Sequence, residues 1–469
     1  MPTHTISVYR YLGSLLAGDL QQENATVLVN LFETETTGEL ADDQGTLDST
    51  DDNVSSFRGS ELTYIGSGTA TPGIAGIPLG TPVPVVVFAD ANGDIFFHYP
   101  AGTPNILSFV GLVLDIDPNV PYEVFPNPYS GTAGQDNYVG DYFGNQMYGL
   151  ADNDTIFGND GEDYIDGGDG NDELRGGNGA DTILGGLGSD LAIGSDGNDS
   201  VTGDGGNDSL YGGKGFDTLD GGIGDDLLDG GSSSDDMNGG SGNDTMTGGR
   251  GIDTLIGGSG NDSIDGDGNR DWLSGGTGSD TLFGGEGDDT LLGGDDDDDM
   301  NGGTGADSMD GGSGNDTMLG GNFDDTMTGG LGNDVMDGGK ADDVMDGGAD
   351  ADTMTGGSGD DAIDGGSGDD LIYGGAGNDT ITGGTGDDRM FGGNGTDTFV
   401  FDAMHGQDTI SGFDAASETL VITGYTESDV TLVDMGSNVL VTFDGSTDSI
   451  YLIGTTLEEI SSLSAFDFV

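Results

Sequence analysis

Aspartate recurs at every ninth residue through the middle of this chain. From Asp154 to Asp397 the spacing is unbroken and places 28 aspartates in one register, and Asp136 and Asn145 lie in the same register upstream. An apolar residue follows two positions after each of the 28 aspartates, as Ile156 follows Asp154. Carboxylates at a fixed period could bind cations, and an unbroken period over this length indicates a repeat architecture.

Each repeat unit joins a glycine-rich segment that ends in Asp to a triplet such as Thr245-Met246-Thr247. An apolar residue in the middle of a triplet predicts a very short strand that faces inward, and the glycines predict a tight turn. One triplet cannot bury its apolar residue alone, so we expect a parallel β-roll with two units per coil and about 14 coils. Ten of the 14 methionines fall in the inward position, which we interpret as core filling.

The aspartates predict which ion the roll binds. Equivalent aspartates such as Asp244 and Asp262 are 18 residues apart and should stack in successive coils. Like charges at a spacing of ~4.8 Å repel by about 1 kcal/mol even in water, so an empty roll should be unstable. Carboxylate and carbonyl oxygens suit Ca²⁺ better than Mg²⁺, and the repeat contains no Cys or His for zinc. We therefore expect calcium between the coils and folding that depends on it.

Eighteen units read in full as GGxGxD. We expect their aspartates to be calcium ligands, together with loop carbonyls such as those of Gly240, Gly242, Gly258 and Gly260. These aspartates are Asp172, Asp181, Asp190, Asp217, Asp226, Asp244, Asp253, Asp262, Asp280, Asp289, Asp307, Asp316, Asp334, Asp361, Asp370, Asp379, Asp388 and Asp397.

Ten further units carry the aspartate behind an altered glycine pattern. They end in Asp154, Asp163, Asp199, Asp208, Asp235, Asp271, Asp298, Asp325, Asp343 and Asp352. The third glycine is replaced by Ser233, Asn269, Asp296, Phe323, Ala341 or Asp350, and the second by Asn159, Ser195, Asp204 or Asp267. Because these side chains replace glycines of a tight turn, we expect distorted loops there. The run Asp295–Asp299 adds an acidic patch that is either solvated, which we favour, or an extra ion site.

The nine-residue unit resembles the calcium-binding repeat of the RTX (repeats-in-toxin) family. Its motif GGxGxDxUx, in which U is apolar, stands here as Gly311-Gly312-Ser313-Gly314-Asn315-Asp316-Thr317-Met318-Leu319. The resemblance implies a right-handed parallel β-roll that holds calcium between its turns through Asp carboxylates and loop carbonyls. It also implies export from a Gram-negative bacterium through type I secretion machinery, with folding outside the cell in millimolar calcium.

Composition divides the chain into three parts, with the repeat at residues 131–397 between two flanks. Residues 1–130 hold all 11 prolines and match no family motif. Strands are expected at Val27–Phe32 and in a hairpin at Val85–Tyr99, which turns at Asn92-Gly93. This flank is expected to be a small all-β domain, and the sequence does not indicate its role.

Residues 398–469 alternate apolar and polar side chains in four segments, which we expect to be strands that cap the roll. The segments are Thr398–Phe401, Glu418–Ile422, Asn438–Phe443 and Ser449–Ile453. The phrase Gly406–Asp414 is similar to the C-terminal caps of RTX proteases and lipases. Residues Phe466–Val469 resemble a type I secretion signal, although an ordinary strand is the plain alternative.

Charge and composition exclude several function classes. The chain has 88 acidic and 8 basic residues, a formal net charge of −80, which excludes nucleic acid and anionic lipid as electrostatic partners. It has no cysteine, so disulfides and thiolate metal sites are excluded. The longest apolar stretch, around Val85–Ala89, is too short to cross a membrane, and the N-terminal residues do not read as a Sec signal peptide.

The sequence offers no known catalytic motif. HExxH and GxSxG are absent, and none of His4, His98 and His405 is followed by Glu. No amphipathic helix of a pore-forming protein is visible. The leading hypothesis is a non-enzymatic, secreted calcium-binding protein with a surface, matrix or adhesion role. Two alternatives remain: an exported enzyme or toxin whose activity lies in residues 1–130, and a calcium-assembled surface-layer or filament protein.

Overall fold

The structure is a computed structural model, and the secondary structure of the residues that it describes is entirely β apart from one short 3-10 helix. The described residues are 3–10, 25–29, 35–41, 56–57, 60–74, 77–78, 83–90, 95–98, 111–116, 129–140, 144–460 and 465–469. Among them, no helix is long or apolar enough to cross a membrane.

The N-terminal strands form one antiparallel sheet. They are β1 (Thr3–Arg10), β2 (Ala25–Val29), β3 (Glu35–Ala41), β4 (Ser56–Phe57), β5 (Ser60–Ile74), β6 (Ile77–Pro78), β7 (Val83–Asp90), β8 (Ile95–His98) and β9 (Gly111–Ile116). The order β5-β4-β3-β1-β8-β7 closes on itself, because β7 also pairs with β5. The antiparallel pairing of β7 with β8 confirms the two strands of the expected hairpin. Its turn at Asn92-Gly93, and the last residues of the expected strand Val27–Phe32, lie outside the described residues.

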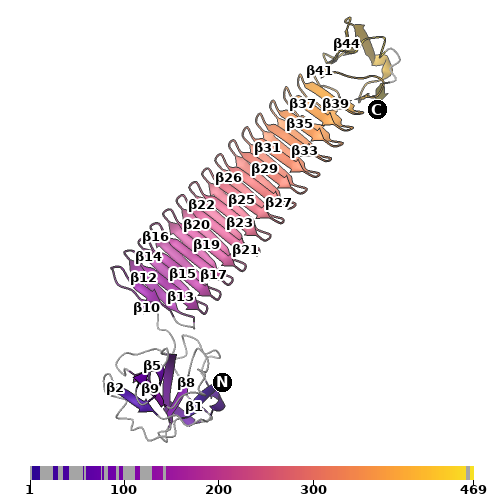
Figure 1. Ribbon diagram of the computed structural model, residues 1–469. Helices are drawn as coiled ribbons and strands as arrows, with labels where there is room; N and C mark the ends of the chain where they lie inside the picture. Colours follow the sequence, from indigo (N-terminus) through magenta and orange to yellow (C-terminus); the bar gives the residue numbers. More distant parts are fainter. Residues whose placement is uncertain are drawn as a thin grey trace. The chain divides into compact units, whose positions relative to one another are not determined.

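The repeat folds into two parallel sheets whose strands alternate along the chain (Figure 1). Each strand pairs with the strand 18 residues later, so Ile183 lies beside Val201 in one sheet and Leu191 beside Ser209 in the other. Two nine-residue units therefore make one coil, and the expectation of a parallel β-roll is confirmed.

The first sheet has 18 strands and the second has 19. The first contains β10 (Tyr129–Ser130), β12 (Gln146–Ala151), β14 (Tyr164–Asp169), β16 (Thr182–Leu187), β18 (Ser200–Gly205), β20 (Thr218–Ile223), β22 (Asp236–Ser241), β24 (Thr254–Ser259), β26 (Trp272–Thr277), β28 (Thr290–Asp295), β30 (Ser308–Ser313), β32 (Thr326–Leu331), β34 (Val344–Ala349), β36 (Ala362–Asp364), β38 (Thr380–Thr382), β40 (Thr398–Phe401), β42 (Thr419–Ile422) and β46 (Phe466–Phe468). The second contains β11 (Asn137–Val139), β13 (Thr155–Asp160), β15 (Glu173–Asn178), β17 (Leu191–Asp196), β19 (Ser209–Lys214), β21 (Leu227–Ser232), β23 (Thr245–Arg250), β25 (Ser263–Gly268), β27 (Thr281–Glu286), β29 (Asp299–Thr304), β31 (Thr317–Asn322), β33 (Val335–Lys340), β35 (Thr353–Ser358), β37 (Leu371–Ala376), β39 (Arg389–Asn394), β41 (Gln407–Ser411), β43 (Val430–Asp434), β44 (Asn438–Phe443) and β45 (Ser449–Ile453).

Most repeat strands are longer than the expected triplet. β23, for example, includes Gly248-Gly249-Arg250 after Thr245-Met246-Thr247. The expectation that all the glycines belong to a turn was wrong, because coils of identical length keep their backbones in register through the first two glycines. The turn itself is therefore short and leads directly into the aspartate.

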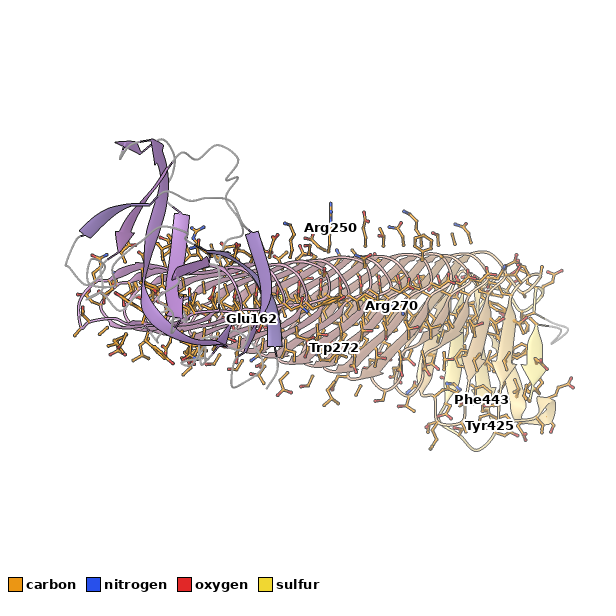
Figure 2. The ribbon with its side chains drawn as sticks, turned by 90° about the horizontal axis from the view of Figure 1, so that it is seen from below. Glu162, Arg250, Arg270, Trp272, Tyr425 and Phe443 are labelled. Atoms are coloured by element: carbon orange, nitrogen blue, oxygen red, sulfur yellow. The ribbon has the colours of Figure 1, made fainter. Side chains whose placement is uncertain are left out.

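One apolar side chain per repeat strand fills the interior of the roll. From Ile156 to Phe399 these side chains are between 0% and 2% exposed, and ten of them are methionines. This confirms the interpretation of the methionines as core residues. Loop side chains such as Arg250 lie on the outside (Figure 2).

The C-terminal strands continue both sheets. β42 and then β46 extend the first sheet in parallel, whereas β41, β45, β44 and β43 extend the second. β44 and β45 pair antiparallel across Asp444-Gly445, and a short 3-10 helix, η2 (Glu427–Asp429), precedes β43. The four strands expected in residues 398–469 are all present.

Candidate calcium-binding site

The aspartates of the repeat form two buried columns, one in each set of loops. All 28 are at most 3% exposed. From Asp190 to Asp379, the backbone N–H of each column aspartate donates a hydrogen bond to Oδ1 of the aspartate one coil further on, as in Asp262 to Asp280 at 2.8 Å. One carboxylate oxygen thus has a fixed structural role and aligns successive loops.

The other carboxylate oxygen, Oδ2, does not take part in this alignment of the loops. In each column aspartate from Asp208 to Asp388, Oδ2 is buried and has no hydrogen-bond partner among the described residues. A buried carboxylate oxygen without a partner carries a desolvation cost of several kcal/mol unless a cation compensates it. The columns therefore present a regular series of oxygens that lack a positive partner.

The first glycine of each loop leaves room beside this oxygen. A Cβ on Gly239 would lie 2.5 Å from Oδ2 of Asp244 and 2.7 Å from the carbonyl oxygen of Gly257 in the next coil. The same Cβ–Oδ2 distance is 2.2–2.7 Å at every first glycine from Gly158 to Gly392. A carboxylate oxygen and a carbonyl oxygen therefore converge on one spot that only glycine keeps open.

The second and third glycines also approach carbonyls of the neighbouring coil. A Cβ on Gly258 would lie 2.2 Å from the carbonyl oxygen of Gly240, and one on Gly260 would lie 1.8 Å from that of Gly242. The carbonyls expected as ligands at these loops thus face the gap between coils. The carbonyl of the first glycine, such as that of Gly257, was missed by the sequence reasoning, which attributed a turn role to this residue.

The environment of the columns disfavours the charged form of the carboxyls. Burial raises the pKa of Asp235, Asp271 and Asp298 to about 7, with a further contribution from neighbouring aspartates of the same column. Burial likewise raises the pKa of Asp388 to about 8. In the described part of the roll, the ion pairs of Arg175, Lys214 and Arg270 all lie at the exposed surface. The columns therefore lack compensation from basic side chains.

This donor set fits calcium. The described residues contain no cluster of three or more His, Cys, Asp or Glu side chains that could hold a metal ion. The oxygens that converge beside the first glycine are an Asp carboxylate oxygen and a backbone carbonyl of the next coil, which is an all-oxygen set of the kind that Ca²⁺ accepts with flexible geometry.

The loops with altered glycines keep a positive φ and the aspartate hydrogen bond of the repeat, and the expected distortion is a local change in the angle at the replaced residue. Ser233, Phe323 and Ala341 adopt φ values of 86°, 80° and 79°, which are positive but smaller than the 112–153° of the positive-φ glycines at the same position, such as Gly278 and Gly170. The aspartates that follow, such as Asp235 and Asp325, accept the same 2.8 Å hydrogen bond as the others. Register between identical coils imposes the loop conformation on residues that disfavour it.

Asp298 belongs to a column, whereas Asp295–Asp297 line a surface hollow with Asp350. Among the described residues, no cluster of metal-binding side chains was found at this hollow.

The columns extend beyond the 28 aspartates at both ends. The N–H of Asn145 donates to Oδ1 of Asp163 at 2.6 Å, and the N–H of Asp388 donates to Oδ1 of Asp408 at 3.0 Å. Asp408 was not recognised as a column residue because Phe401-Asp402 interrupt the nine-residue period. The phrase Gly406-Gln407-Asp408-Thr409-Ile410, which repeats the end of the unit, is the signal that could have identified it.

Comparison with known proteins identifies the repeat. The model of the RTX calcium-binding nonapeptide repeat matches in overlapping copies from residue 130 to residue 399. The search of curated proteins found no significant match.

Three solved structures match parts of this chain at 21–22% sequence identity. A Ca²⁺-dependent, β-helical antifreeze protein from an Antarctic bacterium is 21% identical, covers 64% of this chain and 86% of its own, and has a TM-score of 0.29. Extracellular lipase LipA from Serratia marcescens is 22% identical over 42% of each chain, with a TM-score of 0.24. A subunit of the mannuronan C5-epimerase of Azotobacter vinelandii is 22% identical, covers 26% of this chain and 77% of its own, and has a TM-score of 0.12.

Proposed function

The chain belongs to the RTX family of calcium-binding nonapeptide-repeat proteins, and from this premise we propose that it is an exported, non-enzymatic protein whose β-roll folds when calcium fills it outside the cell. Calcium is its cofactor. Three further points are proposed: the protein folds outside the cell, the column aspartates hold the ions, and the protein is not an enzyme.

The two columns of buried Oδ2 atoms carry the proposal. Each column aspartate loses water on folding, and from Asp208 to Asp388 its Oδ2 atom has no hydrogen-bond partner among the described residues. Ligand that binds only the folded state stabilises it by about 2.7 kcal/mol per site at 100 times the dissociation constant. With sites in nearly every coil, the free energy of folding is dominated by calcium, and submicromolar calcium inside a cell leaves the chain unfolded.

We assign the ligands loop by loop. Each ion takes the Oδ2 atom of a column aspartate, such as Asp244, and carbonyls of the adjoining glycines, such as Gly257. The assignment covers all 28 column aspartates, including the ten behind altered glycines, because loops such as those of Asp235 and Asp325 keep the same hydrogen bond to the aspartate. The repeat region, residues 131–397, is proposed as the calcium-binding domain, flanked by domains at residues 1–130 and 398–469.

An unfolded chain inside the cell and a folded one outside suit type I secretion, which we propose as the export route from a Gram-negative bacterium. The absence of a recognised catalytic motif supports a surface, matrix or adhesion role, and the charge of −80 favours a partner bound through calcium. Turnover by the full chain in a panel of hydrolase substrates would contradict the non-enzymatic assignment.

The test of export is to express the full chain in a bacterium with and without a type I secretion system and to probe each fraction with protease. We expect a protease-sensitive chain in the cytoplasm and a protease-resistant one in medium with millimolar calcium. A chain that is already resistant in the cytoplasm, or that reaches the medium without the secretion system, would contradict the proposal.

A further inference from the structure

The last loop of one column departs from the repeat. Ala403-Met404-His405-Gly406-Gln407-Asp408 occupies the place of a GGxGxD segment, because the backbone N–H of Gly386 donates to the carbonyl of His405 as it would to the third residue of such a segment. Met404 adopts a left-handed φ of 75°, as the second glycine does elsewhere. The backbone of the loop is thus that of a repeat loop, but its side chains are different.

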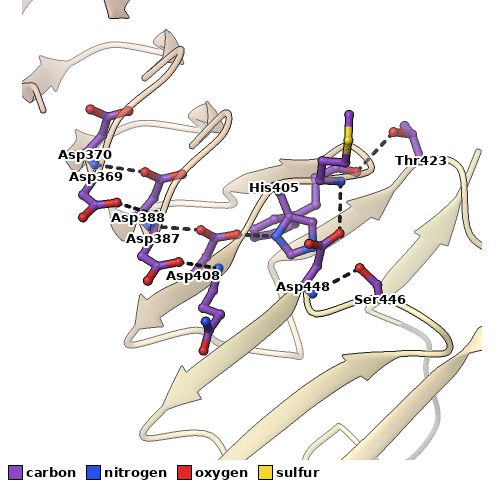
Figure 3. A network of polar contacts seen from close by, with 12 residues as sticks. Asp369, Asp370, Asp387, Asp388, His405, Asp408, Thr423, Ser446 and Asp448 are labelled. Carbon is purple, nitrogen blue, oxygen red and sulfur yellow. Dashed lines mark hydrogen bonds and ion pairs between the residues drawn. The ribbon is translucent and has the colours of Figure 1, made fainter. Parts of the chain in front are cut away.

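The side chain in third position points inward instead of outward. Nδ1 of His405 lies 2.5 Å from Oδ2 of Asp408, and the two side chains are 2% and 1% exposed (Figure 3). When Asp408 is ionised, its carboxylate accepts in this hydrogen bond and Nδ1 donates. Oδ2 of Asp408 has the partner that the Oδ2 atoms of the aspartates from Asp208 to Asp388 lack.

This contact leaves no space for an ion at Asp408. Calcium binds oxygen at roughly 2.3–2.6 Å, so the imidazole nitrogen occupies the distance at which an ion would lie. Ala403 stands in the position of the first glycine, where a Cβ would lie 2.2–2.7 Å from Oδ2 in all loops from Gly158 to Gly392. Two independent departures therefore remove the calcium site from this loop.

The imidazole is held firmly in this position. Phe401 and Phe443 contact its ring edge-on, with centroids 5.1 Å and 5.3 Å away. Asp448 lies on the other side and accepts a 3.0 Å hydrogen bond from the N–H of Met404 (Figure 3). Phe401 is one of the two residues that interrupt the period, so the interruption also supplies a wall of the histidine pocket.

We propose that His405 takes the place of the last calcium ion in its column, so that the ions end at Asp388 and the final coil is closed by a protein side chain. The inference rests on the proposed calcium ligands. The other column ends differently: the loop after Asp397 places the buried side chain of Glu418 next to it, without a basic partner. At the C-terminal end of the roll, one column ends in the pair of His405 and Asp408, and the other ends in two carboxyl groups, Asp397 and Glu418. Only the His405 column closes without an ion.

The test is an anomalous difference map from crystals of the full chain grown in calcium. We expect a series of calcium peaks beside the column aspartates up to Asp388 and no peak within coordinating distance of Asp408. A calcium ion bound to Asp408 in an otherwise filled column would overturn this inference alone. An absence of peaks along both columns would overturn the proposed ligands, and the inference with them.

A variant that restores the repeat loop provides the complementary measurement. Ala403→Gly, Met404→Gly and His405→Ser together recreate the GGxGxD pattern, and we expect one additional calcium peak at Asp408. His405→Asn alone keeps a donor and Ala403, and we expect no additional peak. A restored loop that stays empty while the other sites are filled would show that His405 and Ala403 do not exclude the ion.

Discussion

The backbone N–H of Asp244 donates a 2.8 Å hydrogen bond to Oδ1 of Asp262, one coil further along the roll. The same bond links Asp262 to Asp280, and so on through both columns. One oxygen of each carboxylate therefore sets the coil spacing, and the other faces the gap in which the ion is proposed to bind. Because both tasks fall on one residue, the roll cannot align its loops without also stacking their charges.

The stability of the roll without calcium should depend on pH. The folded-state pKa of Asp235, Asp271 and Asp298 is raised to about 7. Between about pH 4 and pH 7 the folded state thus holds more protons than the unfolded chain, so its stability falls as the pH rises through this window. We expect metal-free protein to gain β structure at pH 5 and to lose it at pH 7.5.

Circular dichroism of exhaustively demetallated protein between pH 5 and pH 8 checks this dependence. In millimolar calcium the trend should reverse, because ligands must be deprotonated to bind the metal. Metal-free protein that is more folded at pH 7.5 than at pH 5 would show that the column carboxyls do not limit folding.

Asp316→Asn should act in opposite directions with and without calcium. The amide keeps an acceptor for the N–H of Asp298 but loses the charge that attracts the ion. In saturating calcium we expect a loss of about 2–3 kcal/mol in the free energy of unfolding, as for one ligand site. In chelator at pH 6 we expect a gain, because one repelling charge is removed. Asp337→Asn, at an exposed position of the next coil, is the matched control and should change neither value. Thermal denaturation of both variants measures the difference, and equal effects would contradict the assigned role of Asp316.

Gly239→Ala should abolish one calcium site by steric means alone. The new Cβ would lie 2.5 Å from Oδ2 of Asp244, and overpacking of this kind costs about 1–3 kcal/mol. Gly268→Ala is the control, because nothing lies within 4 Å of its Cβ position. Isothermal titration with calcium should show fewer bound ions for the first variant only. Unchanged stoichiometry for Gly239→Ala would show that the first glycine does not border the site.

Met318→Ala should destabilise the filled roll strongly, whereas Leu319→Ala should not. Met318 is 1% exposed and fills the interior, and Leu319 is 39% exposed on the same strand. Truncation of a buried Met costs about 2–5 kcal/mol because a cavity remains. Urea denaturation in millimolar calcium compares the two variants, and similar midpoints would contradict the assigned core.

Phe323→Gly should stabilise the roll although it removes an aromatic side chain. Phe323 is 62% exposed and is held at a φ of 80°. Relief of a left-handed conformation is worth about 1–2 kcal/mol, from which the extra freedom of glycine in the unfolded chain subtracts up to about 1 kcal/mol. Leu331→Gly, at a similarly exposed position without positive φ, is expected to destabilise. A lower melting temperature for Phe323→Gly would show that the loop is not strained.

Sequence periodicity predicts most of the roll. The spacing of Asp154 to Asp397 predicts the 18-residue coil, the inward side chains and the stacked carboxyls, because each unit repeats the same local chemistry. The alternation in residues 398–469 likewise predicts the strands at Thr398–Phe401 and Asn438–Phe443.

The missed features all depend on neighbouring coils. The left-handed conformation of Phe323 and Ala341 is imposed by register with adjacent loops, which propensity does not describe. Asp408 was missed because the inserted Phe401-Asp402 break the period, although the strand pairing absorbs both residues. The contact of His405 with Asp408 forms because the final loop turns the side chain of its third residue inward. The sequence pattern alone does not predict the orientation of that side chain.

A calcium titration of metal-free protein at pH 7.5, followed by circular dichroism, tests the central claim most directly. Calcium is proposed to be the component that permits the columns of Asp244 and its equivalents to close. We expect a largely unfolded chain in EDTA and a cooperative gain of β structure as free calcium approaches the millimolar range. A spectrum with the same β content before and after addition of EDTA would contradict the account.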